Sequence, residues 1–198
     1  MLTRENIKSG YIRELIRRAD PDTRLLTDEE LRASVRTILT PEMAGRDVWL
    51  FGYGSLIWNP AFHFVERRLG TLHGYHRRFC LWTHLGRGTP DCPGLVLGLE
   101  RGGSCRGVLV RVAAEAAADE LEIVWRREMV SGAYAPRWVT GRTAGGPVRA
   151  APIFEGARLQ ILNSIAQTTR STLRSPKTDL GLGIMPTTDL QRQRIELK

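Results

Sequence analysis

The sequence predicts an α+β fold, in which an N-terminal helical extension precedes a group of strands and one further helix. Apolar residues recur at helical spacing before residue 46, and short apolar runs alternate with glycine and proline between residues 47 and 112. Strong helix formers then follow from residue 113. With 198 residues and 42% hydrophobic content, the chain is long enough to bury a core.

Residues 1–46 are predicted to form the helical extension, and a first helix is expected at about residues 11–18. Thr27 and Glu30 have the spacing of a capping box, which opens a second helix, and Pro41 ends it. Nothing in this segment suggests chemistry, so we expect it to pack against the rest of the chain. The apolar face of the second helix consists of Leu31, Val35, Ile38 and Leu39.

A glycine-containing loop follows the first predicted strand, which covers residues 48–51. The loop reads Gly52-Tyr53-Gly54-Ser55, and its glycines would let backbone N–H groups approach a small anion. An ordinary hairpin turn would explain the glycines equally well. The loop lacks the spacing of a dinucleotide or phosphate-binding motif, and Ser55 does not lie in a nucleophile elbow.

Further strands are predicted at residues 65–72, 75–82, 95–99 and 107–112, with a turn at residues 101–103. The arginines within residues 75–82 are expected to face solvent or ligand. Residues 86–94 contain two prolines and several glycines, which predict a rigid loop that does not pair as a strand.

The helix predicted from residue 113 to about residue 130 places a carboxylate, Glu128, on its apolar stripe. Arg126 and Arg127 are expected to point away from it. Burial of an unpaired carboxylate raises its pKa, which suits a general base or acid near neutral pH. Alternatively, Glu128 reaches water or pairs with an arginine of another element. The stripe consists of Leu121, Val124, Trp125 and Glu128.

Composition excludes several classes of protein and leaves one rival. The formal charge of +8 is typical of nucleic-acid binding, but the arginines are spread along the chain as separate pairs, which disfavours that function. Cys80, Cys92 and Cys105 show no disulfide or zinc spacing and are expected to be free thiols. The histidines lack partners for a metal site.

The start of the chain has no apolar segment of a signal peptide, and no stretch approaches the ~18 apolar residues of a membrane span. A cytoplasmic location without membrane contact is therefore expected. The sequence gives no signal for the oligomeric state.

Five segments, read together, resemble the ChaC family of γ-glutamylcyclotransferases. They are residues 51–62, 74–82, 86–99, 107–112 and 125–134. The resemblance implies a γ-glutamylcyclotransferase-like mixed β-barrel with flanking helices. It also implies a small-molecule substrate, glutathione, whose γ-glutamyl group is cyclised to 5-oxoproline with release of Cys-Gly, without a metal or cofactor.

Site residues carry over from the same resemblance. Glu128 matches the catalytic glutamate, which would act as the base. The loop that holds the γ-glutamyl group matches Tyr53, Gly54, Ser55 and Leu56. Tyr134, which could also be a core aromatic, and Arg87 are candidate further contacts with the substrate.

Three parts are predicted: a helical extension at residues 1–46 from its helical spacing, a γ-glutamylcyclotransferase-like domain at residues 47–154 from the resemblance, and an atypical polar tail at residues 155–198 where the resemblance ends. No Phe, Trp or Tyr follows Phe154, whereas the family continues with further strands and a helix that carries aromatics. One helix is expected near residues 159–165, and residues 170–198 are expected to be extended or disordered. The altered tail leaves two alternatives: a catalytically impaired homologue that binds γ-glutamyl compounds, and a basic module that binds nucleic acid or protein.

Overall fold

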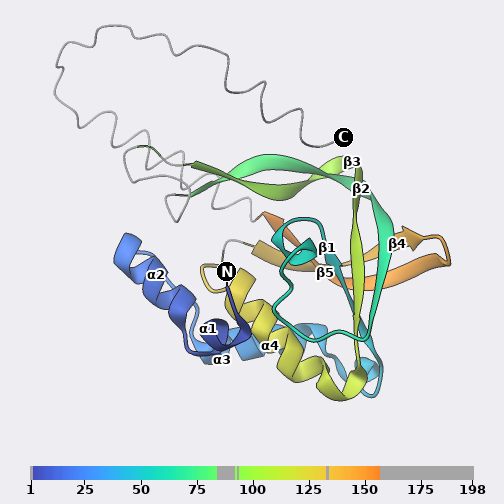
Figure 1. The fold of residues 1–198 in the computed structure, drawn as a ribbon, viewed down its shortest axis with the longest axis horizontal. Helices are drawn as coiled ribbons and strands as arrows, with labels where there is room; N and C mark the ends of the chain where they lie inside the picture. The colour runs from blue at the N-terminus through green and yellow to red at the C-terminus, as the bar shows by residue number, and fades with distance from the viewer. Residues whose placement is uncertain (1, 84–91, 93, 133, 157–198) are drawn as a thin grey trace, which may run out of the picture. The chain divides into compact units, whose positions relative to one another are not determined.

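A computed structural model describes residues 2–83, 92, 94–132 and 134–156. These residues form both helices and a largely antiparallel set of strands, as predicted for an α+β protein (Figure 1). The helices are α1 (Arg4–Lys8), α2 (Tyr11–Ala19), α3 (Asp28–Ile38) and α4 (Ala117–Glu128). The strands are β1 (Val48–Gly52), β2 (Glu66–Thr83), β3 (Gly94–Val112), β4 (Tyr134–Thr143) and β5 (Gly146–Gly156). Among the helices of the described residues, none is long and apolar enough to cross a membrane.

The strands form one curled sheet in the order β1-β3-β2-β4-β5. Each neighbouring pair in this order is antiparallel. The sheet curls so far that β5 also meets β1 and β3, through the parallel pairs Leu50 with Ala151 and Leu99 with Glu155. The predicted α+β class is therefore confirmed, and the two parallel pairs, of one residue pair each, make the largely antiparallel sheet mixed.

Strands β2 and β3 are longer than the sequence predicted. The two strands expected at residues 65–72 and 75–82 form one strand, with a shift in register between His73 and Tyr75. The prediction of a turn at residues 101–103 is wrong, because β3 runs through these residues. Gly74, Gly102 and Gly103 take positive φ angles of 83°, 101° and 67°. Glycine adopts these angles without strain, so the chain forms a bulge here and the ladder continues.

Strand β1 supplies buried side chains to two separate cores, because successive residues of a strand point to opposite faces. Leu50 packs with residues of β3 and of helices α3 and α4, including the fully buried Trp125. Phe51 packs on the other face with residues of β2 and β3 such as Leu72 and Leu109. The loop that follows β1 thus leaves a strand that is buried on both sides, which fixes its position.

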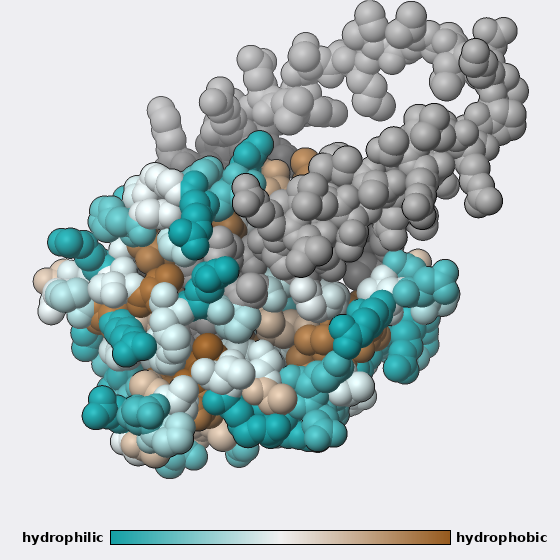
Figure 2. All heavy atoms as spheres, turned by 180° about the vertical axis from the view of Figure 1, so that it is seen from behind, coloured by the Kyte–Doolittle hydropathy of each residue, from teal (hydrophilic) through white to brown (hydrophobic). Residues whose placement is uncertain are grey.

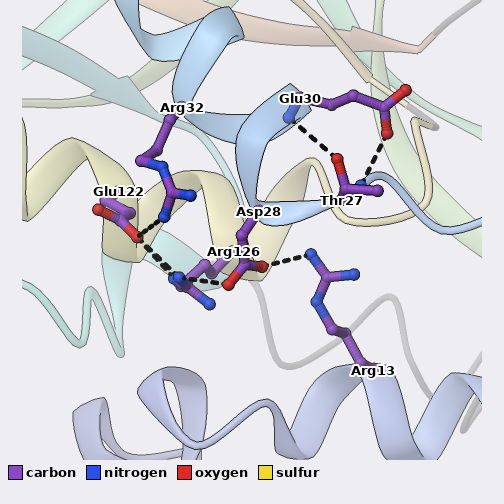
Figure 3. Close-up of polar contacts among 7 residues, drawn as sticks. All are labelled: Arg13, Thr27, Asp28, Glu30, Arg32, Glu122 and Arg126. Atoms are coloured by element: carbon purple, nitrogen blue, oxygen red, sulfur yellow. Dashed lines mark hydrogen bonds and ion pairs between the residues drawn. The ribbon is translucent and has the colours of Figure 1, made fainter.

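Helices α1 and α3 pack against α4, in line with the expected packing of the extension against the rest of the chain. The predicted capping box forms at the start of α3, where Glu30 N–H donates to Thr27 Oγ1 at 3.1 Å and Thr27 N–H donates to Glu30 Oε2 at 2.7 Å (Figure 3). Trp125 Nε1 of α4 donates to Ser34 Oγ of α3 at 3.0 Å. The extension therefore covers the outer side of the helix that carries Glu128.

Charged residues join α2, α3 and α4 (Figure 3). Arg126 donates to Asp28 at 2.9 Å and to Glu122 at 2.7 Å, and Arg13 donates to the other oxygen of Asp28 at 2.7 Å. Figure 2 shows that hydrophilic residues cover much of the described surface on one face, with hydrophobic residues in small separate areas. Many arginines of this basic chain are thus compensated locally by carboxylates.

Candidate active site

The loop after β1 combines a buried tyrosine with an exposed turn. Tyr53 retains 8% of its exposure and packs in the core that contains Phe51. Ser55–Ile57 form a 3₁₀ turn, closed by a hydrogen bond of 2.9 Å from Ile57 N–H to the carbonyl oxygen of Gly54. Because the first N–H groups of such a turn have no acceptor within it, Ser55 and Leu56 can offer theirs to a ligand.

The glycines of this region allow close packing of the backbone. A Cβ atom on Gly107 of β3 would lie 2.4 Å from the carbonyl oxygen of Gly52 and 2.7 Å from the ring of Phe51. A Cβ atom on Gly52 would lie 3.2 Å from Cβ of Leu56. By contrast, a Cβ atom on Gly54 would meet nothing within 4 Å. Gly52 therefore serves packing, while Gly54 borders open space.

Glu128 is the last residue of α4, and one of its carboxylate oxygens is shielded from solvent. The side chain retains 16% of its exposure, but Oε1 is buried and accepts no hydrogen bond from the described residues. Arg127 Nε lies 3.0 Å from this oxygen, close enough for an ion pair but outside the alignment of a hydrogen bond. Burial raises the pKa of Glu128, and the charge of Arg127 offsets this only in part.

The expectation that Arg127 points away from Glu128 is therefore wrong. Arg127 donates to the carbonyl oxygens of Asn59 and Pro60, which hold its guanidinium beside the carboxylate of its neighbour. Arg126 does point away, toward Asp28 and the other ionic partners on α3 and α4. The long side chain of Arg127 follows these carbonyl acceptors, which helical spacing alone does not reveal.

Tyr53, Glu128 and Tyr134 share one electrostatic environment. Burial is the main cause of the raised pKa of Tyr53, and Tyr134 and Glu128 raise it further, as do two thiols. Tyr53 is therefore neutral at physiological pH, and its hydroxyl can donate a hydrogen bond. Tyr134 begins β4 and is half-buried against the core that contains Trp125. The hydrogen bonds from Arg127 to Asn59 and Pro60 also bring the segment after the glycine loop to the end of α4.

The remaining predicted contacts have different positions. Arg87 lies outside the described residues. Ser55 is exposed and Leu56 is buried, so the two differ in access to a ligand. The cysteines are free, as expected. In the described part of the chain, no three His, Cys, Asp or Glu side chains gather as metal ligands would.

Arg77 was not singled out by sequence reasoning, although the arginines of its segment were expected to face solvent or ligand. Its Nη1 donates to the carbonyl oxygen of Tyr53 at 3.5 Å, while the neighbouring Arg78 pairs with Glu100 at 2.8 Å. The alternation of side chains along a strand separates the two arginines. Only the fold shows that Arg77 is the one beside the loop.

The family model described as ChaC-like protein matches residues 48–170 of this sequence. The chain belongs to the ChaC-like family. The match includes the loop after β1, helix α4 and strands β1–β5. The family assignment that the sequence motifs suggested is thereby confirmed.

Two relatives of this ChaC-like chain are named as glutathione-specific gamma-glutamylcyclotransferases. The glutathione-specific gamma-glutamylcyclotransferase of Escherichia coli (strain K12) is 46% identical over 114 residues, which are 58% of this chain and 49% of that protein. The glutathione-specific gamma-glutamylcyclotransferase 1 of Homo sapiens is 38% identical over 95 residues, covering 47% and 43% of the two chains. The chain thus spans about half the length of these relatives or less.

A crystal structure of a gamma-glutamyl cyclotransferase specific to glutathione, from yeast, aligns with a TM-score of 0.48 at 17% identity. The alignment covers 67% of this chain and 89% of that one.

Proposed function

We propose that the chain is a glutathione-specific γ-glutamylcyclotransferase, a lyase that converts the γ-glutamyl group into 5-oxoproline and releases Cys-Gly. Membership of the ChaC-like family and the names of the relatives support this activity. The observation that carries the proposal is the partly buried carboxyl of Glu128, with its shielded Oε1 and its raised pKa, in the electrostatic environment of Tyr53 from the glycine loop.

In the proposed reaction, the α-amino nitrogen of the substrate attacks its own γ-carbonyl carbon. A new C–N bond closes the lactam ring, and the amide bond to the cysteine nitrogen breaks. Glu128, as carboxylate, accepts the proton that the attacking nitrogen loses and then donates it to the departing nitrogen. A carboxyl whose pKa lies above the usual range performs both steps more readily near neutral pH.

Positioning supplies much of the rate in an intramolecular reaction. Ring closure requires the glutamyl chain to be held folded, with the amine against the carbonyl carbon. In this proposal the N–H groups of Ser55 and Leu56, which lack an acceptor within the turn, would hold the α-carboxylate or the oxyanion that develops on the γ-carbonyl. Tyr53 and Tyr134 are the candidate hydroxyl donors beside Glu128.

The proposed site needs no metal or cofactor, because a carboxylate, hydroxyl groups and backbone donors suffice for the proton transfers. The substrate class is a small γ-glutamyl compound. A cytoplasmic location forms part of the proposal, since free thiols such as those of Cys80 and Cys105 are typical of a reducing compartment.

The test is release of 5-oxoproline and Cys-Gly from glutathione by the purified chain and by Glu128→Gln. We expect turnover by the parent and a loss on the order of 10²-fold in the variant. Glu115→Gln, an exposed glutamate just before α4, is the matched control and should retain the parental rate. Circular dichroism of all three proteins shows whether the fold is retained.

Three outcomes would contradict parts of the proposal. Equal turnover by the parent and by Glu128→Gln would make Glu128 structural. A folded but inert parent that still binds glutathione would favour the catalytically impaired homologue. Salt-sensitive binding of DNA or RNA without product would favour the basic module.

A further inference from the structure

A pocket of about 460 Å³ lies beside the glycine loop, over strands β2, β3 and β4. Its volume is within the range of small-molecule sites. Its lining includes the apolar side chains of Ile57, Leu69 and Val108. It also includes four arginines from these three strands, which are Arg67, Arg77, Arg106 and Arg142.

Within the described part of the chain, the four arginines of the pocket lack an acidic partner, whereas ten other arginines have one. None of them forms an ion pair with a carboxylate of the described residues, and no Asp or Glu lines the pocket. Ion pairs are formed instead by Arg4, Arg13, Arg18, Arg24, Arg32, Arg68, Arg78, Arg111, Arg126 and Arg127. Uncompensated positive charge around a concave surface attracts anions, and the guanidinium fork matches a carboxylate.

Two of these arginines connect the pocket to both ends of the candidate substrate loop. Arg77 Nη1 lies 3.5 Å from the carbonyl oxygen of Tyr53, before the turn. Arg67 Nη2 lies 3.4 Å from the carbonyl oxygen of Ile57, at its end. When the γ-glutamyl group of a ligand contacts the loop, the other end of that ligand could therefore reach the arginine pocket.

We propose that this pocket binds the carboxylate at the peptide end of the substrate, opposite the γ-glutamyl group. This inference rests on the proposed function, and it narrows the substrate class to γ-glutamyl peptides that end in a free carboxylate. A γ-glutamyl amine lacks that charge and would leave the four arginines without a partner. Arg106 and Arg142, which contact no loop carbonyl among the described residues, are the positions that test the charge alone.

Binding is measured by calorimetry in the Glu128→Gln background, with glutathione and with its glycine ethyl ester as probes. Neutralising the carboxylate should weaken binding at least about tenfold, the factor that corresponds to ~1.4 kcal/mol. Replacing both Arg106 and Arg142 with Gln should weaken glutathione binding by a similar factor while leaving the ester unaffected. If the arginine substitutions remove the difference in affinity between glutathione and its ester, the arginines interact directly with the carboxylate.

The double variant Arg36→Gln/Arg46→Gln removes two exposed positive charges outside the pocket and controls for the net charge of the chain. It should bind both ligands as the Glu128→Gln background does. Unfolding temperatures of all variants verify that the arginine substitutions leave the fold intact.

Equal binding of glutathione and its ester would overturn the proposal. So would arginine substitutions that weaken the binding of both ligands equally, or a failure of glutathione to bind. Inorganic phosphate is the second probe, since a separate anion site would bind it without competition from glutathione, and that result would also overturn the proposal. Turnover is measured independently on the parent chain. If no 5-oxoproline forms but the ester effect holds, the proposed activity fails while the carboxylate pocket stands.

Discussion

Replacement of Arg4 by alanine should destabilise the chain, because it leaves a buried carboxylate without its cation. Glu120 of α4 retains only 5% of its side-chain exposure. Arg4 donates to both of its oxygens, one of them at 2.9 Å, and the backbone N–H of His63 donates to it at 2.9 Å. The pair joins α1 to α4 and to the segment before β2.

Removing one partner of a buried ion pair typically costs about 3–5 kcal/mol of unfolding free energy. Here we expect about 2–3 kcal/mol, because the contact with His63 remains after substitution. For a chain of this length, such a loss lowers the unfolding temperature by about 4–12 °C. Differential scanning fluorimetry, supported by urea unfolding, measures it.

Arg18→Ala is the matched control, since Arg18 pairs with Glu14 on the exposed side of α2. Exposed ion pairs contribute little, so this variant should unfold at nearly the parental temperature. Similar small shifts in both variants would show that the contact of Arg4 with Glu120 does not hold α1 in place, and would refute the reasoning.

The same pair sets a pH dependence. Burial by itself raises the pKa of Glu120, but hydrogen bonds from Arg4 and His63 outweigh it and hold the pKa below the usual value. A lowered pKa contributes stability above the unfolded-state value, and this stability is lost as pH falls through the folded-state value. The deficit of Arg4→Ala should therefore be full at pH 7 and should shrink below about pH 4. A deficit that is constant down to acid pH would contradict this assignment.

Two further predictions concern stability. Glu128→Gln should stabilise the chain at pH 7, because the raised pKa of Glu128 means that ionisation of its carboxyl destabilises the folded state. This gain should disappear below the pKa of Glu128 in the unfolded state. Urea unfolding at a series of pH values measures the gain. Gly107→Ala should lower the free energy of unfolding by about 1–3 kcal/mol, since the new Cβ would meet backbone and an aromatic ring. Gly145→Ala, whose Cβ would have no contact under 3.8 Å, should leave it unchanged. Equal unfolding free energies of the two variants would refute this account.

The sequence predicted the parts of the fold that local chemistry determines. The capping box at Thr27 and Glu30 is such a case, and so is the apolar stripe of α4, because helical spacing alone places Glu128 beside buried residues. The continuous strands β2 and β3 were not predicted, since glycines such as Gly74 read as breaks. Their pairing across a bulge becomes visible only when both strands are placed.

Prediction of the candidate site was limited in the same way. The glycine loop and Glu128 could be found from the sequence because each interrupts a regular pattern. The position of Arg127 depends on the carbonyl groups of Asn59 and Pro60, which are far away in the sequence. The arginine pocket is assembled from three strands, and each of its members looks like an ordinary surface residue in the sequence.

The central claim is that the carboxyl of Glu128 is the base for γ-glutamyl cyclisation. The most direct test is the pH dependence of kcat/KM for 5-oxoproline formation from glutathione, in the parent and in Glu128→Gln. We expect parental activity to fall in acid with a midpoint above the ordinary glutamate pKa, and the residual activity of the variant to lack this limb. The same acid limb in both proteins would assign the titration to another group and contradict the account.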